Sequence, residues 1–442
     1  MIMTKNNLQN MPPSLPAELP PSLAHILSTS PLKTREAIAM GCFSPLRVLM
    51  SRVKFHYCDG TSKEPACCNI LVAEQGAGKS SIEPIIDAIL QPIEERDRKS
   101  RELEAERRDQ VNSLGSNKAK PAPPKAVIQR IYPNTTMAAL IKRARNAGDL
   151  SLYTYAPEAE LLFNQLPEAS SILRCSYDQS LYGAERASAQ GISDEVRIRW
   201  SINTSTQPHT ARLLLKKELC NGLLTRSSLA TIWTSDEDWG DEMPIQLEIG
   251  EEYRQGLRPY LDRLMQAKGI ITCPEAEKWL QAEKRKQTER LRDMDAKYFL
   301  PYLWRSLQQS FWRACILYIM EGYEWNELIE DFASWSCDHD IWCKFHFFGD
   351  LIENACNNTV PDNSKQRTNL LSLLPDEFTR EQALEMRRQI GRSTTAGALK
   401  NMLSTWTYRG LINFDQDRQL YVKTNECSTA KAIPHNTRAP AE

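Results

Sequence analysis

One short segment of the chain carries the residue types that bind phosphate. Residues 73–81 read AEQGAGKSS, which fits the Walker A pattern except that Ala73 stands in place of its first glycine. Glycines let successive backbone N–H groups turn toward phosphate oxygens, a lysine neutralises the β- and γ-phosphates, and the hydroxyl that follows binds Mg²⁺. We therefore expect a site for ATP and Mg²⁺ here. The expected nucleotide-binding residues are Glu74, Gln75, Gly76, Ala77, Gly78, Lys79, Ser80 and Ser81, with Lys79 also catalytic and Ser80 a metal ligand.

The flanking residues predict the elements that such a loop needs. Residues 66–73 form a short run that is apolar except for Asn69, which is typical of a buried parallel strand. A helix is predicted after the loop by the spacing of Ile82, Ile85, Ile86, Ile89 and Leu90. Its positive dipole end would face the phosphates, although Pro84 removes one N–H near the end of the first turn. The flanks favour a phosphate loop over the alternative, a glycine-rich turn with a surface lysine.

Hydrolysis also needs a carboxylate at the end of a neighbouring strand, to hold the metal through water or to polarise the attacking water. Residues 150–155 (LSLYTY) predict that strand, and Glu158 follows it, with Glu160 nearby. We expect Glu158 to be the catalytic carboxylate and to contribute to the metal site. The alternative is that both glutamates only complement the dipole of the next helix.

Two further polar residues stand beside predicted strands. Residues 196–203 (VRIRWSIN) predict a strand that ends at Asn203, whose amide could sense the γ-phosphate; the alternative is a helix cap at residues 204–206. Arg226 lies between a small turn and the predicted strand 227–233. It could reach the phosphate of a neighbouring subunit as an arginine finger, in a ring or filament, or form only a surface salt bridge.

Strands that alternate with helices predict an α/β fold with a parallel sheet. A further strand is expected at 126–132, followed by a cap at Asn134 or Thr135 and a helix over 137–147. We expect a P-loop NTPase core of the RecA/AAA type over residues 22–245. Residues 92–125 interrupt it as a charged insertion, interpreted as a solvated helix and a Pro-rich loop; the alternative is a nucleic-acid contact through its arginines.

The rest of the chain predicts four other regions. Residues 1–21 form a disordered Pro-rich lead, and residues 246–365 an α-helical domain without a convincing strand. Residues 366–425 show three helical patterns and then a two-stranded hairpin, which is typical of a winged helix; the tail 426–442 is expected to be disordered. The expected DNA-binding residues are Arg392, Thr394, Thr395, Lys400 and Arg418. Alternatively, such a domain binds a protein or simply packs.

Composition excludes several classes of protein. The 442 residues include 55 basic and 56 acidic side chains, a net charge of −1, which excludes nucleic-acid binding by bulk charge but not by a local basic surface. No segment approaches the roughly 18 apolar residues of a membrane span, and the N-terminus has no apolar signal core. The scattered cysteines indicate reduced thiols in a cytoplasmic protein. The spacing of Cys337, His339, Cys343 and His346 does not match the common structural zinc sites.

These segments, in this order, resemble a P-loop family of unknown function found in primase- and helicase-like proteins of phages and mobile genetic elements. The matching stretches are YCDG (57–60), EQGAGKSS (74–81), VIQRIYPNTTMAALIKRA (127–144), LYTYAPEAELL (152–162), SYDQSLYG (176–183) and NGLLTRS (221–227). The resemblance covers roughly residues 20–350. It implies that Lys79 and Ser80 belong to the phosphate loop, that Glu158 is the acidic strand end and that Arg226 is the arginine of the turn. The chain departs from the family at Pro157, where members often carry an acid.

The sequence therefore predicts an ATP-dependent, helicase-like motor ATPase that acts on single-stranded or forked DNA. The resemblance implies a role in replication or mobilisation of a mobile element, together with other replication proteins of that element. The alternative is an ATP-gated DNA-binding initiator or adaptor with little or no hydrolysis, which Pro157 favours. No acidic triad indicates a primase site.

Overall fold

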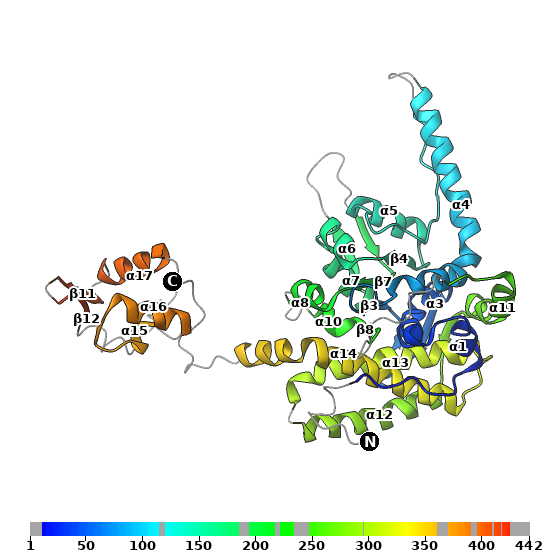
Figure 1. Ribbon diagram of the computed structural model, residues 1–442. Helices are drawn as coiled ribbons and strands as arrows, with labels where there is room; N and C mark the ends of the chain where they lie inside the picture. Colours follow the sequence, from blue (N-terminus) through cyan, green and yellow to red (C-terminus); the bar gives the residue numbers. More distant parts are fainter. Residues whose placement is uncertain are drawn as a thin grey trace, which may run out of the picture. The chain divides into compact units, whose positions relative to one another are not determined.

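The computed structural model describes residues 11–114, 120–184, 194–216, 222–233, 247–294, 296–359, 370–389, 396–408, 411–416 and 418–424. The fold is mixed α/β and 60% helical. The chain forms two compact units, residues 1–357 and 358–442, whose elements are labelled in Figure 1. Within the described ranges no helix has both the length and the apolar character needed to cross a membrane.

A four-stranded, all-parallel sheet lies at the centre of the first unit. Its order is β4 (Leu152–Ala156), β7 (Trp200–Thr206), β3 (Cys68–Val72) and β8 (Ser228–Thr231). Every residue of these strands is buried except Tyr155, which is half-buried. This arrangement is compatible with a Rossmann- or P-loop-like core. Because the strands are parallel, the segments that follow β3, β4 and β7 meet at one edge of the sheet.

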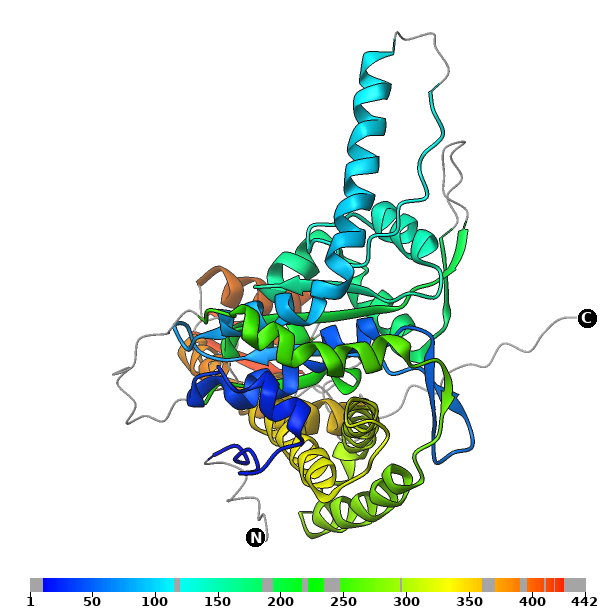
Figure 2. The ribbon, with the colours of Figure 1, turned by 90° about the vertical axis from the view of Figure 1, so that its right-hand side faces the viewer.

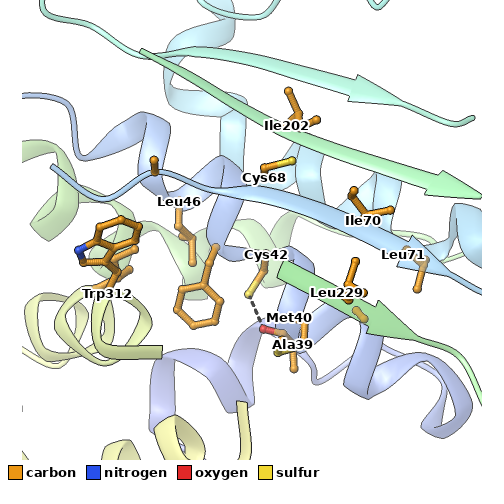
Figure 3. Close-up of a cluster of buried hydrophobic side chains, with 14 of the residues drawn as sticks. Ala39, Met40, Cys42, Leu46, Cys68, Ile70, Leu71, Ile202, Leu229 and Trp312 are labelled. Carbon is orange, nitrogen blue, oxygen red and sulfur yellow. Dashed lines mark hydrogen bonds between the residues drawn. The ribbon is translucent and has the colours of Figure 1, made fainter. Parts of the chain in front are cut away.

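Four short helical segments precede the sheet in sequence: α1 (Pro21–Ile26), the 3₁₀ turn η1 (Leu32–Thr34), α2 (Arg35–Gly41) and α3 (Phe43–Leu49). Of these, α2 and α3 pack against the strands. Figure 3 shows Ala39, Met40, Cys42 and Leu46 beside Cys68, Ile70, Leu71, Ile202 and Leu229 of the strands, with Trp312 close by. The last residue of α2, Gly41, packs against the Ile82 side chain. A Cβ at position 41 would lie 2.3 Å from that side chain, so glycine allows the close approach.

The N-terminal lead is ordered where the structure describes it, which corrects the expectation of disorder for residues 11–21. Leu19 is buried, and the Trp335 indole Nε1 donates to the Pro13 carbonyl at 2.9 Å. Apolar side chains between the prolines allow this extended segment to pack on the helices. Residues 1–10 of the predicted lead lie outside the described ranges.

The helix after the glycine-rich loop is longer than expected. A 3₁₀ turn, η2 (Lys79–Ile82), leads into α4 (Glu83–Ser113), which runs on through the charged segment and projects from the body in Figures 1 and 2. Pro84 lies in the first turn of α4, where its missing N–H costs little. Residues 92–113 of the predicted insertion therefore continue this helix. Midway along α4, the Asp97 carboxylate ties the helix to the extended segment 126–132. It accepts hydrogen bonds from the backbone N–H groups of Gln129 and Arg130 at 3.0 and 2.7 Å.

Three boundaries between β3 and β8 differ from prediction. Residues 126–132 are extended but form only an isolated bridge, between Arg130 and Tyr153, instead of a strand. The cap of α5 (Met137–Ala147) is Thr136, whose hydroxyl accepts the Ala139 N–H, instead of Asn134 or Thr135. The predicted strand 196–203 is divided between β7 and β6 (Asp194–Arg197), which forms a hairpin with β5 (Leu181–Ala184). The helices here are α6 (Ala159–Gln165), α7 (Ala169–Asp178), α8 (Pro208–Lys216) and α10 (Leu223–Arg226).

The region after residue 246 is helical, as predicted, apart from one strand. Its helices are α11 (Glu251–Gln266), α12 (Pro274–Asp293), the 3₁₀ turn η3 (Lys297–Phe299), α13 (Leu300–Met320) and α14 (Glu327–Thr359). The expectation of no strand is wrong, because β9 (Gly269–Ile271) pairs with β1 (Val53–His56), which also pairs with β2 (Ser62–Lys63). One buried apolar cluster extends from Leu19 to Ile352, so these helices and the sheet share a single core.

A buried polar network joins these helices to strand β8. Asp340 and Lys344 of α14 are fully buried, and their charged groups are 2.8 Å apart. Asp340 accepts the backbone N–H of Leu229 at 2.7 Å, and Lys344 donates to the Ser306 hydroxyl at 3.0 Å. Buried Arg313 of α13 donates to the Ser228 hydroxyl. Each charge of the network therefore has a polar partner inside the core.

The second unit has a small core of its own. It contains α15 (Leu370–Leu373), α16 (Arg380–Gln389) and α17 (Ala396–Tyr408), with an antiparallel sheet in the order β10 (Glu377–Phe378), β12 (Leu420–Lys423), β11 (Ile412–Asp415). The core consists of Leu370, Leu371, Leu374, Phe378, Ala383, Leu399, Leu403 and Ile412. Three helices and a hairpin occur in the predicted order, and the short β10 is an addition.

Candidate functional site

A cleft of about 560 Å³ opens at the carboxyl edge of the parallel sheet. Three segments line it, each following or ending a different strand. They supply Gln75, Gly76, Gly78, Lys79 and Ser80 from the glycine-rich loop after β3, Tyr155, Pro157, Glu158 and Glu160 from the end of β4 and beyond, and Ser205, Thr206 and Gln207 from the end of β7. The cleft thus brings the loop together with the carboxylates that were expected to act with it.

The loop conformation depends on its glycines. Gly76 and Gly78 have φ angles of 79° and 87°, in the left-handed region that disfavours other residues. The Lys79 ammonium donates to the carbonyls of Ala73 and Glu74, at 3.0 and 2.9 Å. Lys79 therefore lies back over the loop at the floor of the cleft.

Not every predicted residue of the loop faces the cleft. Gln75, Gly76, Gly78, Lys79 and Ser80 line it, whereas Glu74, Ala77 and Ser81 do not. Ala77 and Ser81 are buried. The Ser81 backbone N–H donates to the Gly78 carbonyl at 3.0 Å, so this residue closes the turn.

Two glutamates face the loop across the cleft. Burial lowers the pKa of the Lys79 ammonium, and the nearby charges of Glu160 and Glu158 oppose that shift. Glu158 is exposed and precedes α6 without a capping hydrogen bond from its side chain. In Glu160, within the first turn of α6, the Oε2 atom is buried and has no hydrogen-bond partner among the described residues. Both carboxylates are available to a ligand of the cleft.

The glutamates follow β4, which is not the immediate neighbour of β3 that the sequence predicts. β7 lies between β3 and β4. The turn after β4 is fastened to β7, because the Ser205 hydroxyl donates to the Pro157 carbonyl. Pro157 itself lines the cleft and offers no acidic group there.

Asn203 is not at a strand tip, and its predicted role as a phosphate sensor is wrong in position. β7 continues to Thr206, so Asn203 lies inside the strand, 2% exposed, and its amide Nδ2 donates to the Gly41 carbonyl at 3.0 Å. Gln207 takes the position at the tip and lines the cleft. Sequence reasoning missed Gln207 because the polar residues before it resemble a loop more than a buried strand.

Arg226 lies at the opposite edge of the sheet. It ends α10 just before β8, whose first residue, Ser228, is paired with Asn69 near the start of β3. Its guanidinium pairs with Asp178 at 2.7 Å and donates to the Gly222 carbonyl at 3.0 Å. The structure therefore forms the salt bridge that was the alternative to an arginine finger, and the cleft of the same chain is out of its reach.

The residues expected to bind DNA are only partly described. Arg392, Thr394 and Thr395 lie outside the described ranges, whereas Lys400 is exposed on α17. Arg418 forms two hydrogen bonds with Glu377, at 2.6 and 3.0 Å, and this contact raises its pKa. Arg418 would have to exchange this partner to reach a phosphate.

The cysteines and histidines of α14 do not form a metal site. Among the described residues, no group of three side chains is placed to hold a metal ion. Cys337, His339 and Cys343 are buried, and His346 stacks on Trp342 with ring centres 4.5 Å apart. Burial lowers the pKa of His339 to about 4.

No family model matches the chain, and no curated protein matches it.

Proposed function

We propose that the chain is a P-loop ATPase that acts on DNA during replication or mobilisation of a mobile genetic element. The observation that carries the proposal is the cleft, in which the glycine-rich loop, Lys79 and Ser80 lie with the carboxylates of Glu158 and Glu160, and Glu160 Oε2 has no hydrogen-bond partner among the described residues. Backbone N–H groups, an ammonium, a hydroxyl and carboxylates are the donors that a Mg²⁺-nucleotide requires. The residues present thus fit Mg²⁺ and ATP.

The proposal includes a fold class for each of the two units. The parallel sheet with its glycine-rich loop after a central strand supports a RecA/AAA-like core, and the helices and hairpin of the second unit support a winged helix that binds DNA. Assembly into a ring or filament, other replication proteins as partners and a cytoplasmic location complete it. Of the residues expected to bind DNA, Lys400 is described as exposed, and it is the candidate of the second unit for contact with DNA phosphates.

Each side chain of the cleft then has a role that follows from its position. Lys79, which now donates to two loop carbonyls, would donate instead to the β- and γ-phosphates, and the Ser80 hydroxyl and a glutamate would hold the metal directly or through water. Bound Mg²⁺ supplies neutralisation of the phosphate charge. Glu158 or Glu160 orients the attacking water.

The decisive experiment measures ATP hydrolysis with and without single-stranded DNA. We expect turnover that DNA stimulates and that is lost in Lys79→Ala. Glu158→Gln and Glu160→Gln, assayed in parallel, identify the residue that orients water as the one whose loss abolishes turnover but preserves ATP binding. Failure of the wild-type protein to bind ATP would contradict the proposal.

A second candidate function is an ATP-gated DNA-binding switch with little turnover. Two observations favour it: Arg226 is held by Asp178, and Pro157 occupies a position in the cleft that could have carried an acid. ATP binding without hydrolysis, combined with DNA affinity that depends on ATP, would support this switch over the motor.

A further inference from the structure

A second cavity, of about 450 Å³, lies in the first unit between the turn after β1 and helix α12. We call it the α12 groove. Its lining includes Cys58 of the turn and, from α12, Lys284, Arg285, Thr288, Glu289 and Arg292. None of these residues belongs to the cleft at the glycine-rich loop, so the groove is a separate feature of the surface.

The cations of the groove differ from their neighbours on the same helix. Lys286 pairs with Glu283 at 3.0 Å, and Arg290 pairs with Asp338 at 2.7 Å. Lys284, Arg285 and Arg292 are exposed, and within the described part of the chain they have no ion-pair partner.

Among the described residues that line the groove, Glu289 is the one carboxylate. With three cations against it, the lining carries a positive charge on a chain whose net charge is −1. A local field of this sign attracts an anion even though the whole chain is nearly neutral.

The spacing of the cations fits a repeating anion better than a single small one. Lys284 and Arg292 are separated by two helical turns, about 12 Å along α12. Phosphates of one strand of duplex DNA recur about every 3.4 Å along the helix axis, so the two ends of the groove reach different phosphates. Thr288 lies between them on the same face, and its hydroxyl donates to the Lys284 carbonyl at 2.7 Å, which leaves the cations as the groups that contact phosphates.

We propose that the α12 groove binds the sugar-phosphate backbone of DNA without reading its bases. This inference rests on the proposed function, because it names the surface of the first unit along which the DNA of that function lies. An acidic protein segment is the competing occupant, and it would leave DNA binding independent of the groove.

The first test compares two variants of equal charge. One replaces Lys284, Arg285 and Arg292 with glutamine; the matched control replaces Lys120, Lys216 and Lys268, three exposed lysines outside the groove, with glutamine. Affinity for a fluorescein-labelled single-stranded oligonucleotide is measured by anisotropy over a range of salt concentrations. We expect roughly tenfold or greater weakening in the groove variant, with a salt slope smaller by about 2 for three lost phosphate contacts. The control should stay within about twofold, and equal weakening of both variants would overturn the proposal.

The second test locates the DNA directly, with no change to the groove. Cys58 is exposed in the groove, and Cys175 of α7 is a partly exposed reference outside its lining. Alkylation of both thiols is followed by mass spectrometry with and without saturating DNA. We expect DNA to slow the alkylation of Cys58 several-fold and to leave Cys175 unchanged. An unprotected Cys58 would overturn the proposal.

The two tests separate failure of the groove from failure of the proposed function. If wild-type protein binds DNA and hydrolyses ATP while the groove variant behaves identically, the groove is not the DNA surface and the ATPase proposal stands. If wild-type protein hydrolyses ATP but binds no DNA, the DNA part of both proposals fails. The melting temperature and basal ATP hydrolysis of the groove variant show that it is folded.

Discussion

Polar side chains gather in two places around the same parallel sheet, and their partners differ. At the carboxyl edge, the described hydrogen bonds of Lys79 go to loop carbonyls, and a carboxylate oxygen of Glu160 has no described partner. Beside β8, the charges of Asp340, Lys344 and Arg313 are all satisfied within the protein. Satisfied charges hold the architecture, whereas unsatisfied ones at a sheet edge are available to a ligand. Substitutions should therefore affect stability in one place and chemistry in the other.

The largest expected effect is on stability, from Lys344→Ala. This change leaves the buried Asp340 carboxylate without its cation, at an expected cost of about 3–5 kcal/mol in the free energy of unfolding, measured by denaturant titration. Lys63→Ala is the control, because the Lys63–Asp59 pair is exposed and should cost about 1 kcal/mol or less. Equal effects of the two variants would show that the network beside β8 is not structural.

Lys79→Ala should affect ATP hydrolysis and leave stability nearly unchanged. We expect roughly a 100-fold or greater loss of ATP hydrolysis, because the ammonium that neutralises phosphate charge is removed. The melting temperature should hardly change, since the described partners of Lys79 are two carbonyls of its own loop. Unfolding of this variant would mean that the carboxyl edge also depends on internal pairing.

His339 is an exception among the buried polar groups, since neither ring nitrogen has a hydrogen-bond partner among the described residues. Burial lowers its pKa to about 4, against about 6.5 in the unfolded chain, so the unfolded state binds more protons between these values. Stability should therefore fall as the pH drops through this window, by about 2 kcal/mol from pH 7 to pH 5. Denaturant unfolding of wild type and His339→Leu at both pH values checks this. Parallel losses in the two proteins would contradict it.

The smallest expected effect is that of Arg226→Gln. Its ion pair with Asp178 is partly exposed, so we expect a loss of about 1 kcal/mol or less in stability. Hydrolysis of ATP should stay within about twofold of wild type. If Arg226 acts as an arginine finger, its loss would instead lower turnover by roughly 10³-fold or more. Arg226 would then belong with Lys79 among the residues that act in chemistry.

The sequence predicted best the elements whose signals are local. The apolar run at 66–73, the glycines and Lys79 after it and the spaced isoleucines of α4 each identify their element without reference to the rest of the chain. Glu158 was expected in the site because it directly follows a strand, and it does line the cleft.

What the sequence could not supply depends on distant partners. β7 is buried although residues 203–206 are all polar, so only its pairing with β3 and β4 shows where it ends and why Gln207 lies in the cleft. β9 has three residues and forms a strand by pairing with β1, which lies more than two hundred positions earlier in the sequence. Residues 126–132 have the composition of a strand, but they make a single bridge to β4.

Helix α4 has a mechanical consequence. Its 31 residues make a rod about 46 Å long, and it begins one 3₁₀ turn from Lys79 and Ser80. Its N-terminal part is packed in the core through Ile85, Ile86, Ile89 and Ile93, so the rod is joined without a break to the residues beside the phosphate-binding loop. The part beyond Asp97 extends about 24 Å from that packed base. A tilt of about 10° of this outer part alone would move the tip by about 4 Å and leave the core packing intact.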